Sequence, residues 1–199
     1  MAAPRNEDLK KKIVDTTTDL LKIKSFPYIS LAEIAKEAGI SKGTLYYYFK
    51  NKNEILLQIY DDYLENQWQQ LIEWTENKDK DTSLHRMINY VLERSVVSPE
   101  LRMHLIHESM FGNEELKKRI NERYNQFRYL IGEKISERSE NFDSDSLALL
   151  ILFLSDGIVV QKVLDNENID TDSFISDFID KLRNKKMEVD YVGKTRYFF

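Results

Sequence analysis

The segment spanning residues 30 to 52 constrains the fold most, because it contains several helix starts and one helix stop within a short length. Ser30 is followed three residues later by Glu33, the capping-box pattern that begins a helix. Gly39 can adopt the left-handed conformation that ends such a helix, and Ser41 is a second helix cap. Two short helices joined by a tight turn are typical of a helix-turn-helix unit.

The second of these helices has an unusual outer face. Leu45 and Phe49 are four residues apart, so they share the face that we expect to be buried. Three successive tyrosines, residues 46 to 48, then lie largely outside that face. Tyrosine hydroxyls and nearby lysines suit phosphate contacts, and Gly43 leaves room for base edges to approach the backbone. Packing against neighbouring helices is the alternative for each tyrosine alone, but the combined spacing favours a DNA-reading helix.

Residues Ile34 to Leu56 closely resemble the signature of the tetracycline-repressor (TetR) family of bacterial regulators. By motif the resemblance extends from Ile13 to about Leu57, and by helical layout over most of the remaining chain. It implies an all-α fold of about nine helices, with an N-terminal three-helix helix-turn-helix DNA-binding domain at residues 1–52. It also implies a helical effector-binding and dimerisation domain at residues 53–199.

The resemblance further assigns roles in binding double-stranded operator DNA. It implies phosphate contacts from Ser30, Ser41, Tyr47 and Lys52, base-edge contacts from Lys42, Gly43, Thr44 and Tyr46, and either kind of contact from Tyr48. One departure stands upstream, where Ser25-Phe26-Pro27 replaces the glycine and aromatic residue that usually follow the family's first helix. Because proline stops a helix, we expect the first helix to end differently here.

Charge is divided unevenly along the chain, whose net charge is −5. Residues 1–52 contain ten Lys or Arg against six Asp or Glu, whereas the remainder contains nineteen against twenty-eight. A basic head on an acidic body favours one orientation on a polyanion. On charge alone, ordinary variation of a protein surface is the simpler interpretation.

Several features bound the cellular setting. The chain has no Cys, which excludes disulfides and thiolate metal sites and agrees with a cytoplasmic location. Residues 1–12 are charged and lack the apolar run of a signal peptide. The longest apolar stretch, residues 147–154 with residues 158–160 beyond it, is shorter than the roughly 20 residues that cross a bilayer. We therefore expect a buried helix there and no membrane partner.

Cap signals and apolar spacing predict a series of helices in the body and no strands. Their expected ranges are Asn51 to Trp74, Thr82 or Ser83 to Val97, a helix opening at Ser98-Pro99-Glu100, Asn113 to Glu140, Asp143 to Asp165, and Thr171 to Met187. The fifth of these is apolar on more than one side, and the sixth carries Phe174, Ile175, Phe178, Ile179 and Leu182. The resemblance implies that these two helices form a four-helix bundle in a homodimer. Burial within a single chain is the alternative.

The resemblance also implies that the body binds an unidentified small-molecule effector. Candidate ligand contacts are Tyr63, Tyr90, His107, Phe111, Tyr124, Phe127 and Asp156, with Tyr60, Trp68, Phe153, His104, Asn89 and Gln161 as further cavity-lining candidates. Most aromatic residues at helical spacing are ordinary core residues. Asp156 needs a partner, and with Gly157 beside it the carboxylate suits either a ligand contact or a dimer interface.

Other chemistries find little support. His104, His107 and Glu108 have a spacing that brings two imidazoles and a carboxylate to one helix face, although solvent-facing roles are the simpler interpretation. We find no phosphate loop, nucleophile motif or convincing carboxylate pair, so we expect no enzyme, cofactor or metal. The sequence predicts a homodimeric repressor released from its operator by a ligand. The alternative is control by a protein partner. The aromatic segment Tyr191 to Phe199 has no assigned role.

Overall fold

The described part of the chain is entirely helical. The structure, a computed structural model, describes residues 6–184, so the segment Tyr191 to Phe199 lies outside it. Within that range it contains nine α-helices, one 3-10 helix and no strand, which confirms the all-α prediction. The elements are α1 (Asn6–Leu21), η1 (Phe26–Tyr28), α2 (Leu31–Glu37), α3 (Lys42–Tyr48), α4 (Lys52–Thr75), α5 (Leu84–Ser95), α6 (Pro99–Met110), α7 (Glu114–Ser136), α8 (Ser144–Val163) and α9 (Thr171–Asn184).

The predicted caps form the helix starts of the head. The Ser30 hydroxyl accepts a hydrogen bond from the Glu33 amide at 3.1 Å, and the Ser41 hydroxyl accepts one from the Thr44 amide at 3.0 Å. Between the two helices Gly39 has φ +63°, the left-handed conformation that a side chain would strain. The head therefore has the predicted turn between α2 and α3.

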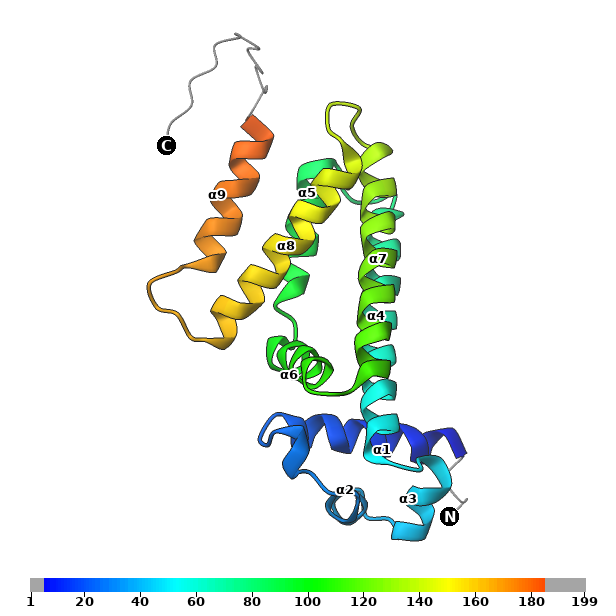
Figure 1. Cartoon of the computed structure of the whole chain (residues 1–199). Helices are drawn as coiled ribbons and strands as arrows, with labels where there is room; N and C mark the ends of the chain where they lie inside the picture. The colour runs from blue at the N-terminus through cyan, green and yellow to red at the C-terminus, as the bar shows by residue number, and fades with distance from the viewer. Residues whose placement is uncertain (1–5, 185–199) are drawn as a thin grey trace.

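The N-terminal core extends beyond the head. It joins α1, α2 and α3 to the first turns of α4, and it also takes in Leu105 from α6 and Leu116 from α7. A second core fills the body between α4, α5, α7, α8 and α9. In Figure 1, α4 rises from the head and continues beside α7 through the body. The predicted boundary after residue 52 thus falls where α4 begins, while head packing continues to Tyr60.

Helix α8 differs from the expectation in two ways. At 20 residues it is, among the described helices, the one that is long and apolar enough to cross a membrane, so the expectation that the segment is too short is wrong. That is weak support for a membrane role, because packed core helices meet the same criterion. Only 39% of its apolar segment is buried, in contacts with α5, α6 and α7. Leu150 and Phe153 on the same helix are exposed. α8 is therefore half-buried, with an apolar outer side.

Candidate DNA interface and candidate ligand cavity

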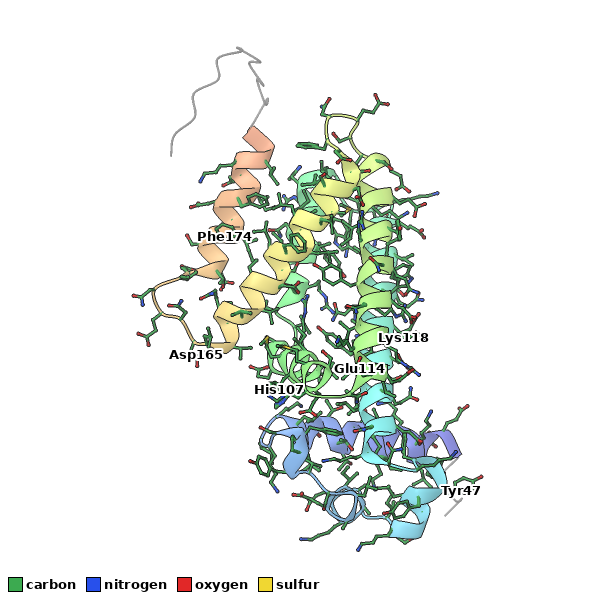
Figure 2. All side chains as sticks on the ribbon, in the orientation of Figure 1. Tyr47, His107, Glu114, Lys118, Asp165 and Phe174 are labelled. Carbon is green, nitrogen blue, oxygen red and sulfur yellow. The ribbon has the colours of Figure 1, made fainter. Side chains whose placement is uncertain are left out.

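Helix α3 separates a buried face from an open one. Leu45 and Phe49 are buried in the head core, whereas Tyr46 and Tyr47 expose 54% and 75% of their surface. Tyr48 is half-buried, and its ring meets that of Tyr47 edge-on with centroids 5.2 Å apart. Figure 2 shows Tyr47 at the outer edge of the head. Two of the three tyrosines are thus free to contact another molecule.

The amino end of α3 is open to close approach. Lys42 and Gly43 are exposed there, and the Ser41 hydroxyl lies 2.8 Å from the Thr44 hydroxyl. A Cβ added at Gly43 would meet only the Ser41 hydroxyl, at an ordinary 3.7 Å. Packing within the protein therefore does not require glycine at this position. A molecule approaching from outside would explain the glycine.

The structure gives Lys52 a role that the sequence did not predict. Its Nζ donates to the backbone carbonyls of Phe26, Pro27 and Ile29 at 3.0, 3.2 and 3.3 Å, and lies 4.6 Å from the Phe26 ring centroid. The ammonium thereby joins the start of α4 to the η1 turn. This turn is where Pro27 departs from the family pattern, and Lys52 ties it to the head. A phosphate contact by Lys52 would have to share this ammonium with three carbonyls.

Ser30, the remaining predicted phosphate ligand, is exposed at the start of α2. Nearby Glu33 pairs with Lys24. The hydrogen bond from Lys24, together with the Ser30 backbone, holds the pKa of Glu33 below its ordinary value. The first turn of α2 is therefore fixed by both its cap and an ion pair, and it presents the Ser30 side to solvent.

A cavity of about 260 Å³ lies in the body between α4, α5, α6, α7 and α8. Most of its wall is apolar or aromatic. The lining residues are Tyr60, Tyr63, Leu64, Gln67, Leu71, Tyr90, Val91, Arg94, Ser95, Arg102, Leu105, Ile106, Ile120, Arg123, Tyr124, Phe127, Ile131, Leu152, Ser155 and Asp156. The structure brings together five of the seven predicted ligand contacts: Tyr63, Tyr90, Tyr124, Phe127 and Asp156.

His107 and Phe111 lie outside the cavity. Both are exposed at the end of α6, where their ring centroids are 4.6 Å apart. Figure 2 shows His107 on the part of the body nearest the head. Gly112, with φ +109°, follows directly, and neither ring is part of the cavity lining. Phe153, another candidate, is 61% exposed on the outer side of α8.

Asp156 obtains its partners from its own chain. Its carboxylate accepts hydrogen bonds from Arg102 and, at 3.3 Å, from the Tyr124 hydroxyl. Burial, reinforced by the Asp156 charge, raises the pKa of Tyr124, so the phenol remains a neutral donor. The sequence left Asp156 between a ligand contact and a dimer contact, and the structure places it in the cavity wall as an internal ion pair.

Three arginines in the cavity wall were missed from the sequence. Arg94, Arg102 and Arg123 come from α5, α6 and α7, and arginines are usually expected on solvated faces. One signal was present: Met87, Tyr90 and Arg94 recur at helical spacing, so this arginine continues the inward face of α5.

The histidine cluster on α6 shows no metal-binding geometry. His107 Nδ1 lies 3.3 Å from Glu108 Oε1, on an exposed part of the helix. Across residues 6–184, no group of three His, Cys, Asp or Glu side chains is arranged to hold a metal ion.

Comparison with known proteins identifies the head. Residues 13–59, which contain most of α1, the helix-turn-helix and the start of α4, match the model for bacterial regulatory proteins of the tetR family. Residues 13–59 therefore form a TetR-type DNA-binding segment. EthR, an HTH-type transcriptional regulator of Mycolicibacterium smegmatis, is 42% identical over 60 residues, which cover 30% of this chain and 28% of EthR.

Other relatives match more of the body. The fatty acid metabolism regulator protein of Bacillus subtilis is 28% identical over 116 residues, covering 56% of this chain and 58% of the relative. The chain thus spans less than two thirds of both curated relatives. A transcriptional regulator from Saccharomonospora viridis, solved in complex with choline, has a TM-score of 0.76 and 18% identity, covering 90% of this chain and 98% of that one. This similarity shows the shared fold.

Proposed function

We propose that this protein is a sequence-specific DNA-binding transcription regulator of the TetR family, a homodimeric repressor that a small molecule releases from its operator. The observation that carries this proposal is the continuity of α4. Its first turns place Ile55 and Ile59 in the head core, and the same helix places Tyr63 and Leu64 in the cavity wall. Any ligand that shifts α4 must therefore also move the surface that presents α3.

A second element connects the same two regions. Leu105 on α6 lines the cavity and is also buried in the N-terminal core. A ligand regulates DNA binding only if its affinity differs between two arrangements of the protein. A ligand that contacts α4 and α6 would create such a difference, because both helices contact the head and the cavity at once.

The proposed homodimer would form through the outer sides of α8 and α9. Leu150 and Phe153 on α8 and Phe174 on α9 are exposed, and the Phe174 ring stacks on that of Phe178 with centroids 6.1 Å apart. Figure 2 shows Phe174 on the part of the molecule remote from α7. A second copy would cover this apolar surface, and twofold symmetry would present two α3 helices to two half-sites.

If a protein partner controlled this regulator in place of a ligand, its body would not need a cavity. The cavity in the body therefore supports the small-molecule proposal. The names of the relatives mention different compounds: the Saccharomonospora viridis regulator was solved in complex with choline, and the Bacillus subtilis relative is named for fatty acid metabolism. A regulator of this kind would act in the cytoplasm, where bacterial DNA lies.

The test uses the full chain. Selection from randomised duplexes should yield a site with twofold symmetry, and light scattering on the complex should give two protein chains per site. Adding candidate metabolites should release this site, as measured by fluorescence anisotropy. Binding without sequence preference would contradict the regulator proposal, and a single chain on a full site would contradict the dimer.

A further inference from the structure

The charges in the cavity wall do not balance. Its lining contains Arg94, Arg102 and Arg123 but one carboxylate, Asp156. Arg102 pairs with Asp156, and Arg123 pairs at 2.7 Å with Glu65, which lies outside the lining. Within residues 6–184, Arg94 has no carboxylate within 4 Å. One guanidinium of the cavity wall is thus left without a counterion.

Arg94 is also incompletely hydrogen-bonded. Its Nη2 donates to the side-chain oxygen of Gln70, a neutral acceptor. Its Nε is buried and has no hydrogen-bond partner in the described part of the protein. Leaving a buried charged donor unsatisfied is energetically unfavourable. The protein carries this cost at a position that borders the cavity.

Arg94 and Arg102 both act electrostatically on Tyr63, another residue of the wall. Burial raises the pKa of Tyr63, and the nearby charges of Arg102 and Arg94 oppose that rise. Both guanidinium groups therefore lie within electrostatic range of one phenol. That phenol donates to the Val97 carbonyl at 3.3 Å. A ligand with a hydrogen-bond acceptor near Arg94 and Arg102 would meet one cation without a counterion, Arg94, and one that is already paired with Asp156, Arg102.

Most of the remaining wall is apolar or aromatic, and it includes Leu64, Val91, Ile120 and Leu152. At about 260 Å³ the cavity lies just below the roughly 300–1,000 Å³ typical of drug-sized ligands. A compact hydrocarbon or aromatic body therefore fits. Asp156, the acid that would attract a cation, already accepts from Arg102 and Tyr124.

We propose that the effector is a compact amphipathic anion, a carboxylic acid with an apolar body, whose carboxylate pairs with Arg94. This inference rests on the proposed function in taking the cavity as the effector site. It adds the chemical class of the effector and the residue that selects it. A carboxylate would supply Arg94 with both a counterion and acceptors, an interaction about twice as strong as a neutral hydrogen bond.

The experiment compares three probes that share one chain length: octanoate, octan-1-ol and octyltrimethylammonium. Binding to the full chain is measured by calorimetry and by tryptophan fluorescence. Both tryptophans report on the wall, because Trp68 contacts Phe127 edge-on at 5.4 Å and Trp74 stacks on Tyr90 at 4.7 Å. Octanoate should bind about tenfold or more tightly than octan-1-ol, the factor that a charge-assisted hydrogen bond provides.

Variants assign the preference to one residue. Arg94→Met should remove the advantage of octanoate over octan-1-ol, whereas Arg94→Lys should retain most of it. Arg86→Met is the matched control, because Arg86 is on the same helix but exposed and outside the lining. Arg94→Gln provides the same comparison if the methionine variant does not fold.

The outcomes separate the two proposals. Equal binding of octanoate and octan-1-ol, tighter binding of the cation, no binding of any probe, or full octanoate binding by Arg94→Met would each overturn the anion proposal. None of these results affects the search for a DNA site. If octanoate binds as expected but the chain selects no DNA, the anion site stands and the regulator proposal fails.

Discussion

At the residue scale, Lys52 shows that one side chain can serve both the fold and the interface. Lys52→Met removes the donor to three carbonyls, and it should lower the free energy of unfolding by about 1–3 kcal/mol. Lys50→Met, at an exposed neighbouring lysine, should leave stability unchanged. Urea unfolding of both variants measures the difference. Equal stability would show that the carbonyl contacts contribute nothing.

Tyr47 offers a cleaner test of phosphate binding than Lys52. Its ring is 75% exposed, so Tyr47→Phe should not change stability. The loss of one hydroxyl contact should weaken binding to specific and random DNA by the same factor, about five- to tenfold for about 1 kcal/mol. Anisotropy titrations on both kinds of duplex measure it, with Tyr46→Phe as the matched variant predicted to alter sequence preference. Relaxed base preference in Tyr47→Phe would refute the phosphate assignment.

At the element scale, two adjacent residues of α8, Asp156 and Gly157, lie on different sides of the helix. Asp156 enters the cavity, whereas Gly157 is exposed and a Cβ there would meet no atom within 4 Å. Gly157→Trp should therefore be tolerated by the single chain but should block close approach of a second α8, raising the dimer dissociation constant at least about tenfold. Analytical ultracentrifugation measures the dissociation constant, with Glu133→Trp at an exposed position of α7 as the control. An unchanged dissociation constant would show that the dimer interface does not include this side of α8.

The contact between α7 and α8 should make stability depend on pH. Arg128 holds Asp145 from two guanidinium nitrogens, with Nε 2.6 Å from Oδ1. The hydrogen bond lowers the pKa of Asp145 from its ordinary 3.8. Because the folded-state pKa is depressed, the stabilisation is present above about pH 4 and is lost as pH falls through the lower folded value.

Asp145→Asn should therefore lessen the fall in the free energy of unfolding that accompanies acidification below pH 4. Both side chains of the pair are partly exposed to solvent, so the effect on stability at neutral pH should be small. Chemical unfolding between pH 3 and pH 7 checks both statements. Identical pH profiles for the variant and the parent protein would contradict the assignment.

Helix starts were predictable from sequence because caps act locally. Ser30, Ser41 and Asn51 each accept from an amide three residues ahead, so their effect does not depend on distant packing. The cavity was only partly predictable. Tyr63 and Phe111 are both aromatic residues on or next to a helix that lines the cavity. Tertiary packing alone places Tyr63 in the cavity wall and leaves Phe111 exposed.

At the scale of the whole molecule, the basic head should dominate the salt dependence of DNA binding. Each lysine that neutralises a phosphate contributes about one to the slope of log affinity against log salt. Lys50→Met, at an exposed lysine beside the three tyrosines, should therefore reduce the slope by about two in a dimer, which has two heads. Lys118→Met, an exposed change in the body, should leave it unchanged. Titrations from low to moderate salt measure both slopes, and equal slopes would exclude Lys50 from phosphate contact.

The sharing of Leu105 and Leu116 between head and body has a consequence for how such proteins can be recombined. A chimera that joined this head to another body after residue 52 would remove the first turns of α4 and both leucines from the core that they complete. The transferred head would then lack the apolar residues from α4, α6 and α7 that complete its core. Heads of this type can be exchanged as functional units only together with the residues of α4, α6 and α7 that pack against them.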